Sequence, residues 1–320
     1  MNHRRHMLAT SALWLSCLIV PELTAAQTLN VTLLGTGVPT PSADRFQAAT
    51  LIEAGAKKIL IDAGRGVSVR LWQLGIPLSQ IDGVFVTHFH SDHINGLADL
   101  WATGWLPTQY GRRNHPLRVW GPVGTAEITA GIEQSYAQDV AIRAVDENLP
   151  VEAAAFTSTE FSIGGVVYDE DGVKVTAFEV NHGELIKPAY GYRVDYAGRS
   201  VLISGDTKYD ERIIAAGKGV DLLIHEVMST DERIFQIAPR LLNVKNHHTM
   251  PDEVGVIFDR VRPKLAVYSH LVMLSLPGIP VPPLSDLVER TRATYRGPLV
   301  VGADLMRFEI GDSVQVYSGP

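Results

Sequence analysis

Residues 87–93 read Thr-His-Phe-His-Ser-Asp-His, which places His88, His90, Asp92 and His93 within six positions of one another. Three imidazoles and a carboxylate this close together are hard to explain as packing. Neutral imidazole is the most common metal ligand in proteins, and zinc accepts nitrogen and oxygen donors at short range. In an extended chain, His88 and His90 face the same side, while Asp92 and His93 follow in the next turn. One short segment can therefore supply ligands to two metal ions.

The same polar residue types follow other apolar runs along the chain. Five runs rich in valine, isoleucine and leucine each lead directly to one histidine or aspartate: Asp62, His88, His182, Asp206 and His270. We expect these runs to be strands and the polar residues to lie at their carboxyl ends. A rigid sheet edge can hold such side chains in a fixed geometry. A single histidine after a strand is ordinary, but five such positions together with residues 88–93 predict a shared site.

The apolar runs alternate with helical patterns and with glycine and proline. Strands are expected at Asn30–Leu34, Ala49–Ile52, Lys58–Ile61, Val84–Val86, Leu117–Trp120, Val173–Val180, Tyr190–Val194, Ser200–Ile203, Leu222–Ile224 and Leu265–Tyr268. Helices are expected at Gly66–Leu74, Gly96–Trp105, Thr125–Ala137, Pro251–Val261 and Leu284–Tyr295. In the Pro251 helix the apolar residues follow the helical repeat, and proline suits its first turn. Strands and helices mixed in this way predict an α/β protein with layered sheets.

With these motifs, the chain resembles the metallo-β-lactamase superfamily over essentially its whole length after residue 26. Within that superfamily it resembles the ribonuclease Z and metallo-type arylsulfatase branch, and it is most similar to the exported arylsulfatase-like members. The branch is indicated by Leu34-Gly35-Thr36-Gly37, by Gly205-Asp206-Thr207, by His225-Glu226 and by His248-Thr249. The resemblance implies a four-layer αββα sandwich with a dinuclear metal site at the sheet edge.

The resemblance also implies a ligand set and two Zn²⁺ ions per chain. One zinc would be bound by His88, His90 and His182, the other by Asp92, His93 and His270, and Asp206 would bridge them. This leaves room for a shared water or hydroxide. Asp62 would not touch the metal but would accept a hydrogen bond from an imidazole or a backbone N–H. Ligand types of this kind discriminate poorly between zinc, manganese and iron.

Three residues are expected to serve catalysis. A metal-bridging hydroxide would be the nucleophile, because one zinc ion alone can lower the pKa of water to about 7. The resemblance gives His248 the role of donating a proton or a hydrogen bond to the ester, with Glu226 orienting its ring. Asp92 would act in catalysis as well as in metal binding. The alternative for His248 and Glu226 is that they only cap adjacent elements.

Residues 1–26 have the pattern of a secretory signal peptide. Arg4 and Arg5 precede the apolar run Leu8–Val20, and Thr24-Ala25-Ala26 forms a small-residue cleavage site. The run is shorter than the roughly 20 residues of a spanning helix, so no membrane attachment is expected after cleavage. The paired arginines are compatible with the twin-arginine route. We therefore predict a single metallo-β-lactamase-like hydrolase domain over residues 27–320, located in the periplasm or secreted.

Composition narrows the chemistry and the partners. Cys17, the only cysteine, lies in the expected signal peptide, so the mature chain would have no disulfide and only histidine and carboxylate ligands. The net charge is −7, and an acidic protein is poorly suited to neutralising nucleic-acid phosphates. We therefore expect a small anionic ester as the partner and no nucleic acid. The resemblance also implies a homodimer.

Among hydrolases of the branch, ribonuclease Z is the main competitor. The resemblance implies that it carries a tRNA-binding arm between the third and fourth motifs, whereas His182 and Asp206 are only 24 residues apart here. Phe46 also replaces the asparagine expected after Arg45. The sequence therefore favours arylsulfatase-like hydrolysis of a sulfate ester. Phosphodiesterase or ribonuclease Z-type hydrolysis is the alternative, and lactam or lactone hydrolysis is less favoured. In a different class, the chain is a non-catalytic zinc-binding protein on a hydrolase fold.

Two tryptophans could pack in the core or line an aryl-binding pocket. Trp101 and Trp105 are four residues apart on the helix expected after the metal-binding segment. That spacing predicts core packing first and a wall for an aryl group second. Tyr110 and Trp120 are weaker candidates for such a wall. His225 is expected to pack at a strand end, and His115 and His247 to be solvated.

Overall fold

The computed structural model describes residues 28–319. The predicted signal peptide, residues 1–26, lies outside these described residues. Within them, no helix has the length and apolar character needed to cross a membrane.

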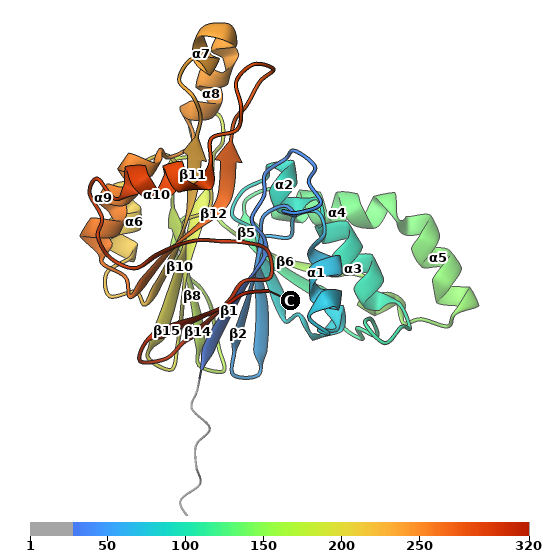
Figure 1. The fold of residues 1–320 in the computed structure, drawn as a ribbon. Helices are drawn as coiled ribbons and strands as arrows, with labels where there is room; N and C mark the ends of the chain where they lie inside the picture. Colours follow the sequence, from blue (N-terminus) through green and yellow to red (C-terminus); the bar gives the residue numbers. More distant parts are fainter. Residues whose placement is uncertain (1–27, 320) are drawn as a thin grey trace, which may run out of the picture.

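The described chain forms two β-sheets. The first has eight strands in the order β15, β14, β1, β2, β3, β4, β5, β6, where β3 to β6 run parallel (Figure 1). Their bounds are β1 Leu29–Gly35, β2 Ala49–Ala54, β3 Lys57–Ile61, β4 Gly83–Phe85, β5 Leu117–Pro122, β6 Phe156–Phe161, β14 Arg307–Ile310 and β15 Val314–Tyr317.

The second sheet has seven strands in the order β13, β12, β11, β10, β9, β8, β7. Strands β10 to β13 run parallel, so their carboxyl ends meet at one edge. The bounds are β7 Gly165–Glu170, β8 Val173–Glu179, β9 Tyr190–Tyr196, β10 Arg199–Ile203, β11 Leu222–Ser229, β12 Leu265–Met273 and β13 Leu299–Val301.

Helices cover the outer faces of both sheets (Figure 1). Apolar side chains of α1 (Val67–Gln73) and α3 (Leu97–Trp105) pack on the outer face of the first sheet. Those of α6 (Glu211–Ala216), α9 (Pro251–Val261) and α10 (Leu284–Thr291) pack on the second. A third apolar cluster fills the space between the sheets. This is the predicted αββα sandwich.

Local sequence explains these elements. In β8 the alternate residues Val173, Val175 and Ala177 are buried between the sheets, as period-two alternation requires. Helix α9 has the predicted bounds. Its buried face includes Val254 and Phe258, and the Glu253 carboxylate accepts a hydrogen bond from the backbone N–H of Met250.

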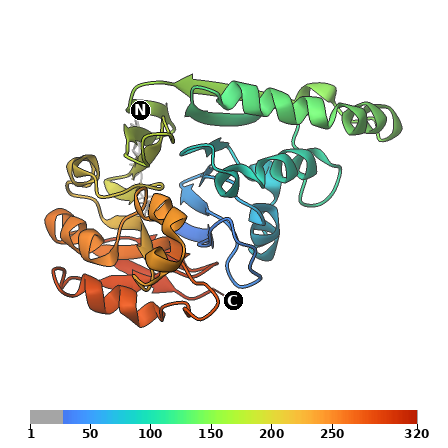
Figure 2. The same ribbon diagram turned by 90° about the horizontal axis from the view of Figure 1, so that it is seen from above.

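Three helical regions differ from prediction. The helix expected over Leu284–Tyr295 ends at Thr291, as α10. The helix expected over Thr125–Ala137 ends earlier, as α4 (Thr125–Ser135), and a second helix, α5 (Ala137–Asp146), follows it. Helix α5 has no buried residue, but its apolar residues Ala137, Val140, Ala141 and Ala144 follow the helical repeat, so the sequence carried a signal that was missed. Seen from above, these green helices extend away from the sandwich (Figure 2). Residues 231–247 form an unpredicted projection with two short helices, α7 (Ile234–Ile237) and α8 (Leu242–Lys245).

Candidate metal centre

The predicted ligands come together at the edge where both sheets present their strand ends. Asp62 follows β3, His88 lies in the loop after β4, and Asp206 follows β10. Asp92 and His93 lie on the short helix α2 (Ser91–Ile94), directly after that loop. The elements that hold the site therefore belong to both layers of strands, so the site depends on how the sheets pack against each other.

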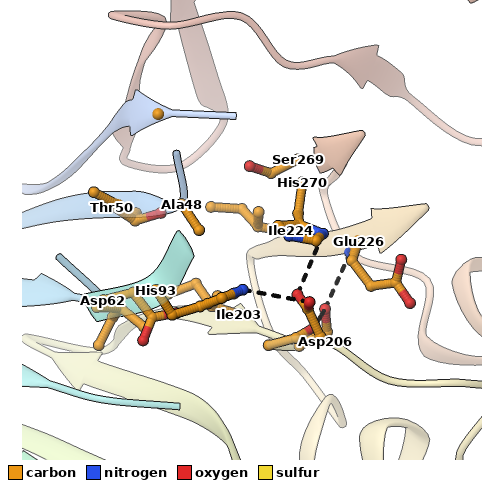
Figure 3. A pocket seen from close by; sticks show the side chains of 15 residues that line it. Ala48, Thr50, Asp62, His93, Ile203, Asp206, Ile224, Glu226, Ser269 and His270 are labelled. Carbon is orange, nitrogen blue, oxygen red and sulfur yellow. Dashed lines mark hydrogen bonds and ion pairs between the residues drawn. The ribbon is translucent and has the colours of Figure 1, made fainter. Parts of the chain in front are cut away.

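The side chains form two groups, and within each group the ligand atoms lie within 4.8 Å of one another. The first group contains His88, His90, His182 and Asp206, and the second contains Asp92, His93 and His270. Asp206 also lies between them: its Oδ2 is 3.3 Å from His93 Nε2, and its Oδ1 is 3.3 Å from His270 Nδ1. Figure 3 shows His93 and His270 turned toward Asp206.

Unpartnered buried atoms show that these groups fit a cation. Twelve buried side-chain nitrogen and oxygen atoms of residues 28–319 lack a hydrogen-bond partner, and four of them belong to these two groups: His88 Nε2, His93 Nε2, Asp206 Oδ1 and His270 Nδ1. A buried polar atom without a partner costs about 1–3 kcal/mol, and a bound divalent cation would remove that cost by accepting their lone pairs. The cluster is therefore a candidate site for divalent metal, and zinc suits this donor set.

Hydrogen bonds orient the imidazoles with their free nitrogens toward the cluster. His93 Nδ1–H donates to Asp62 Oδ2 at 2.7 Å, and His182 Nδ1–H donates to the backbone carbonyl of His247 at 2.8 Å. The Thr87 hydroxyl lies 3.0 Å from His88 Nδ1 and donates to Asp62 at 2.9 Å. In each case the other ring nitrogen keeps its lone pair for a metal.

Asp62 thus lies beside His93 and outside the two metal groups, as expected from the sequence. Its second oxygen accepts the backbone N–H of Thr87 at 2.8 Å. Thr87 was not among the predicted residues; its position directly before the first histidine of the motif is the signal that could have indicated it.

His270 differs from prediction. It does not follow a strand but lies inside β12, at a register shift where Glu226 pairs with Ser269 and Val227 with Leu271. Its φ of 45° lies in the left-handed region, which costs a non-glycine residue about 1–3 kcal/mol. A β-bulge of this kind turns one side chain out of the regular alternation. Here the turned side chain places His270 Nε2 3.1 Å from Asp92 Oδ2.

For His88, His182 and Asp206, electrostatics agree with the charge states that metal ligands need. His93 differs: burial alone would lower its pKa, but the charges of Asp206 and Asp62 outweigh burial and raise this pKa well above its usual value. Burial lowers the pKa of His182 to about 3 and lowers the pKa of His88 well below its usual value. Both imidazoles are therefore neutral near neutral pH, as metal binding requires. Burial alone would raise the pKa of Asp206, but His270 and His93 outweigh it and hold this pKa well below its usual value. Asp206 is therefore a carboxylate.

A second buried pair lies beside the metal groups. His248 is 8% exposed and Glu226 only 2%, and His248 Nδ1 lies 3.3 Å from Glu226 Oε2. The other oxygen, Glu226 Oε1, accepts the backbone N–H of Thr249 at 2.9 Å. Burial alone would lower the pKa of His248, but the charge of Glu226 outweighs it and raises this pKa. His248 also shares a cluster with Asp206 and His270, with ligand atoms within 4.8 Å. The structure thus places His248, and Glu226 through it, beside the metal groups.

The aromatic candidates are core residues. Trp101 is 1% exposed and stacks on Phe156 with ring centroids 5.3 Å apart. Trp105 is also buried, and its indole N–H donates to the carbonyl of Pro150. Both belong to the cluster on the outer face of the first sheet, and Tyr110 packs against it. Trp120 belongs to the cluster between the sheets. The core interpretation is confirmed for the two tryptophans of α3, and the aryl-wall alternative is wrong.

Of the remaining histidines, two lie in the environments expected from sequence and one does not. His225 is buried in β11 with its ring against Phe258, as expected, and His115 is exposed. His247 was expected to be solvated, but it is half-buried, with its ring centroid 4.9 Å from those of His182 and His248. The Pro-rich segment Ser275–Pro283 lines, with Leu271 and the loop after β1, a cavity of about 760 Å³.

Comparison with known proteins places this architecture in a family. The beta-lactamase superfamily domain matches residues 57–271. The ribonuclease Z of Mycobacterium sp. (strain KMS) is 33% identical over 293 residues, which cover 90% of this chain and 98% of that protein.

Two solved structures share the fold. The metallo-β-lactamase fold protein YhfI from Bacillus subtilis has a TM-score of 0.67 at 18% identity and covers 88% of this chain and 100% of its own. Human tRNase Z, short form, has a TM-score of 0.63 at 21% identity and covers 91% of this chain and 99% of its own. Together with the sandwich and the His/Asp groups at its edge, these matches show that the chain belongs to the metallo-β-lactamase superfamily and is a metal-dependent ester hydrolase.

Proposed function

We propose that this protein hydrolyses phosphodiester bonds at the metal centre. The observation that carries the proposal is the buried His248–Glu226 pair beside Asp206 and His270. A histidine that donates a proton beside a cation site would supply the combination that cleavage of an anionic ester requires. The relative that is 33% identical over 90% of this chain is named ribonuclease Z, an enzyme that acts on phosphodiester bonds, and this favours phosphodiesters over the sulfate esters expected from sequence.

The proposed roles of the residues follow from their contacts. His88, His90, His182 and Asp206 would hold one Zn²⁺, and Asp92, His93, His270 and Asp206 the other. When bound, these ions supply Lewis acidity toward the phosphoryl group and an activated water near neutral pH. Asp62 keeps His93 in the tautomer that can bind metal, through its 2.7 Å bond to Nδ1.

His248 would supply the proton that the departing oxygen needs. Glu226 raises the pKa of His248 and so keeps its ring protonated to higher pH than that of an isolated buried histidine. The backbone N–H of Thr249 fixes Glu226 in turn, and the same residue follows His248 in the chain. The backbone N–H of Thr207 donates to the same Glu226 oxygen at 3.4 Å, so hydrogen bonds from two segments anchor Glu226. Such anchoring lets the geometry of an acid–base pair persist during turnover.

The substrate we propose is a small phosphodiester. Between His182 and Asp206 the chain forms β9 and β10, joined by Ala197 and Gly198, with no projecting arm in this described segment. The net charge of −7 also gives little attraction for a long polyanion. Export to the periplasm or beyond the cell is a further part of the proposal, supported by the sequence of residues 1–26 alone; fractionation of cells expressing the chain with and without these residues tests it.

The test is a comparison of reporter esters with metal analysis. The purified protein should contain about two zinc ions per chain and cleave bis(p-nitrophenyl) phosphate faster than p-nitrophenyl sulfate. His88→Ala and Asp206→Ala should lose both metal and turnover, because each removes a ligand from the first group. Faster cleavage of the sulfate would return the assignment to the arylsulfatase branch. Full metal content without turnover of either ester would favour a non-catalytic zinc-binding protein.

A further inference from the structure

A buried carboxylate outside the metal groups connects distant parts of the chain. Asp304 lies between β13 and β14, and its side chain is 4% exposed. Its Oδ1 accepts the backbone N–H and the hydroxyl of Thr36 at 2.9 and 2.8 Å. Its Oδ2 accepts two further hydrogen bonds, one from the backbone N–H of Phe46 at 2.7 Å and one from Arg70 Nη2 at 2.8 Å. A carboxylate has about four lone-pair sites, so these four hydrogen bonds satisfy its acceptor capacity.

The partners of Asp304 define a loop, residues 36–47, that follows β1. Thr36 and Phe46 stand at the two ends of this loop, so one carboxylate holds both ends. Gly37 N–H donates to the Phe46 carbonyl at 2.7 Å, which closes the loop. Arg45 Nη1 donates to the Thr36 hydroxyl at 2.6 Å and to the Gly302 carbonyl at 2.8 Å. The position of Thr36 is therefore set mainly by Asp304 and Arg45.

The other side of Thr36 faces the metal centre. Its backbone carbonyl accepts the N–H of Leu271 at 3.0 Å. Leu271 directly follows His270, the residue with φ of 45° at the register shift of β12. A left-handed non-glycine residue persists only where its surroundings hold it. The Thr36–Leu271 bond is one such restraint, and it joins the loop after β1 in the first sheet to β12 in the second.

We propose that Asp304 is a positioning residue for the metal centre, which, through Thr36 and the backbone of Leu271, holds His270 in place beside Asp92 and Asp206. The inference rests on the proposed metal-dependent function, in which His270 is a ligand of the second group. It does not require Asp304 to touch metal or substrate. Loss of Asp304 lets Thr36 and the Leu271 N–H shift, and His270 then loses part of its alignment.

The test measures metal affinity in the full chain with a chelator-buffered titration, alongside kcat, KM and thermal stability. Asp304→Asn should weaken the affinity for the more weakly held ion by about 10–100-fold and lower kcat more than KM. Asp221→Asn is the matched control. Asp221 is also a buried carboxylate that accepts a backbone N–H, from Ser200 at 2.8 Å, but it precedes β11 at the end far from the metals. It should lower thermal stability and leave metal affinity unchanged.

A second pair of variants keeps the test decisive if Asp304→Asn does not fold. Thr36→Val removes the hydroxyl bonds that fix Thr36, whereas Arg70→Gln removes a bond to Asp304 that does not lead to His270. Weaker metal binding in Thr36→Val but not in Arg70→Gln supports the proposal. Unchanged metal affinity in Asp304→Asn or Thr36→Val, or an equal loss in Arg70→Gln, overturns it. A wild-type protein that binds metal without turnover would instead contradict the proposed function and leave this inference open to the same measurement.

Discussion

Replacing Asp62 with asparagine tests how far the metal centre depends on a residue that does not touch the metal. Asp62 is 4% exposed, and its Oδ2 lies 2.7 Å from His93 Nδ1. Asparagine has nearly the same shape and keeps one oxygen to accept the Thr87 N–H. It loses the charge and the second acceptor, and its NH₂ group then faces the His93 N–H. The change therefore affects two bonds to Oδ2: the 2.9 Å bond from the Thr87 hydroxyl, which can still bond to the remaining oxygen, and the bond from His93, which is lost.

The magnitude follows from that bond. A hydrogen bond to a charged group contributes about 1.5–3 kcal/mol. Loss of the partner of a metal-binding histidine lowers metal affinity by about 10–100-fold, or about 1.4–2.7 kcal/mol, so the two ranges agree. We expect Asp62→Asn to weaken binding of one metal ion by this factor. In the metal-free protein, the free energy of unfolding should fall by about 1–3 kcal/mol, because a buried N–H loses its acceptor.

Competition with a chelator measures the affinity, and urea unfolding of the metal-free protein measures stability separately. Asp221→Asn, remote from the metals, should reduce stability alone. If Asp62→Asn binds both ions within about twofold of the wild-type affinity, then this hydrogen bond does not set the orientation of His93, and the argument from the tautomer fails.

Three further predictions concern acid–base chemistry and the core. His248→Ala should retain the metal content but slow turnover by about 10²–10⁴-fold for esters with poor leaving groups and much less for p-nitrophenyl esters; equal slowing for both would contradict proton donation. Glu226→Gln removes the charge that raises the pKa of His248, so burial dominates and this pKa falls; because the proton donor is lost as pH rises through its pKa, the alkaline limb of kcat/KM should move to lower pH, and an unmoved limb would show that His248 does not carry the titrating proton. Trp101→Ala should lower the free energy of unfolding by about 3–5 kcal/mol in urea titrations, with KM unchanged, since this side chain is 1% exposed in the core; a raised KM with little loss of stability would restore the aryl-wall interpretation.

Most of the fold could be predicted because apolar periodicity reports burial. Helix α9 and ten of the fifteen strands in the described residues carry clear patterns and were recognised, whereas β6, β7, β13, β14 and β15 were not expected. Helix α5 and the projection at residues 231–247 were not expected either. In helix α5 the repeat of Ala137, Val140, Ala141 and Ala144 was present and was overlooked. The helices of the projection have four residues each, which is too few for a periodic signal.

In the candidate site, too, local features could be predicted from the sequence and long-range features could not. Spacing alone brought together His88, His90, Asp92 and His93, because all four lie on one loop and the short helix that follows it. His247 was misplaced because its environment depends on His182, which comes from a distant segment of the chain. Sequence also cannot show that β12 continues through His270, since the bulge and the positive φ arise from pairing with β11.

The sequence by itself determined the chemistry available to this protein: a His/Asp ligand set, a histidine and glutamate suited to proton transfer, and a layered α/β fold. These follow from residue types and local spacing, which the chain carries without reference to its folded shape. Only the tertiary structure decided which of these residues meet. The two sheets must pack face to face before His182, Asp206 and His270 reach the histidines of residues 88–93. Asp304 contacts Thr36, 268 residues earlier in the chain, and so holds the loop after β1. Long-range contacts of this kind depend on the whole packed core, so no local pattern encodes them.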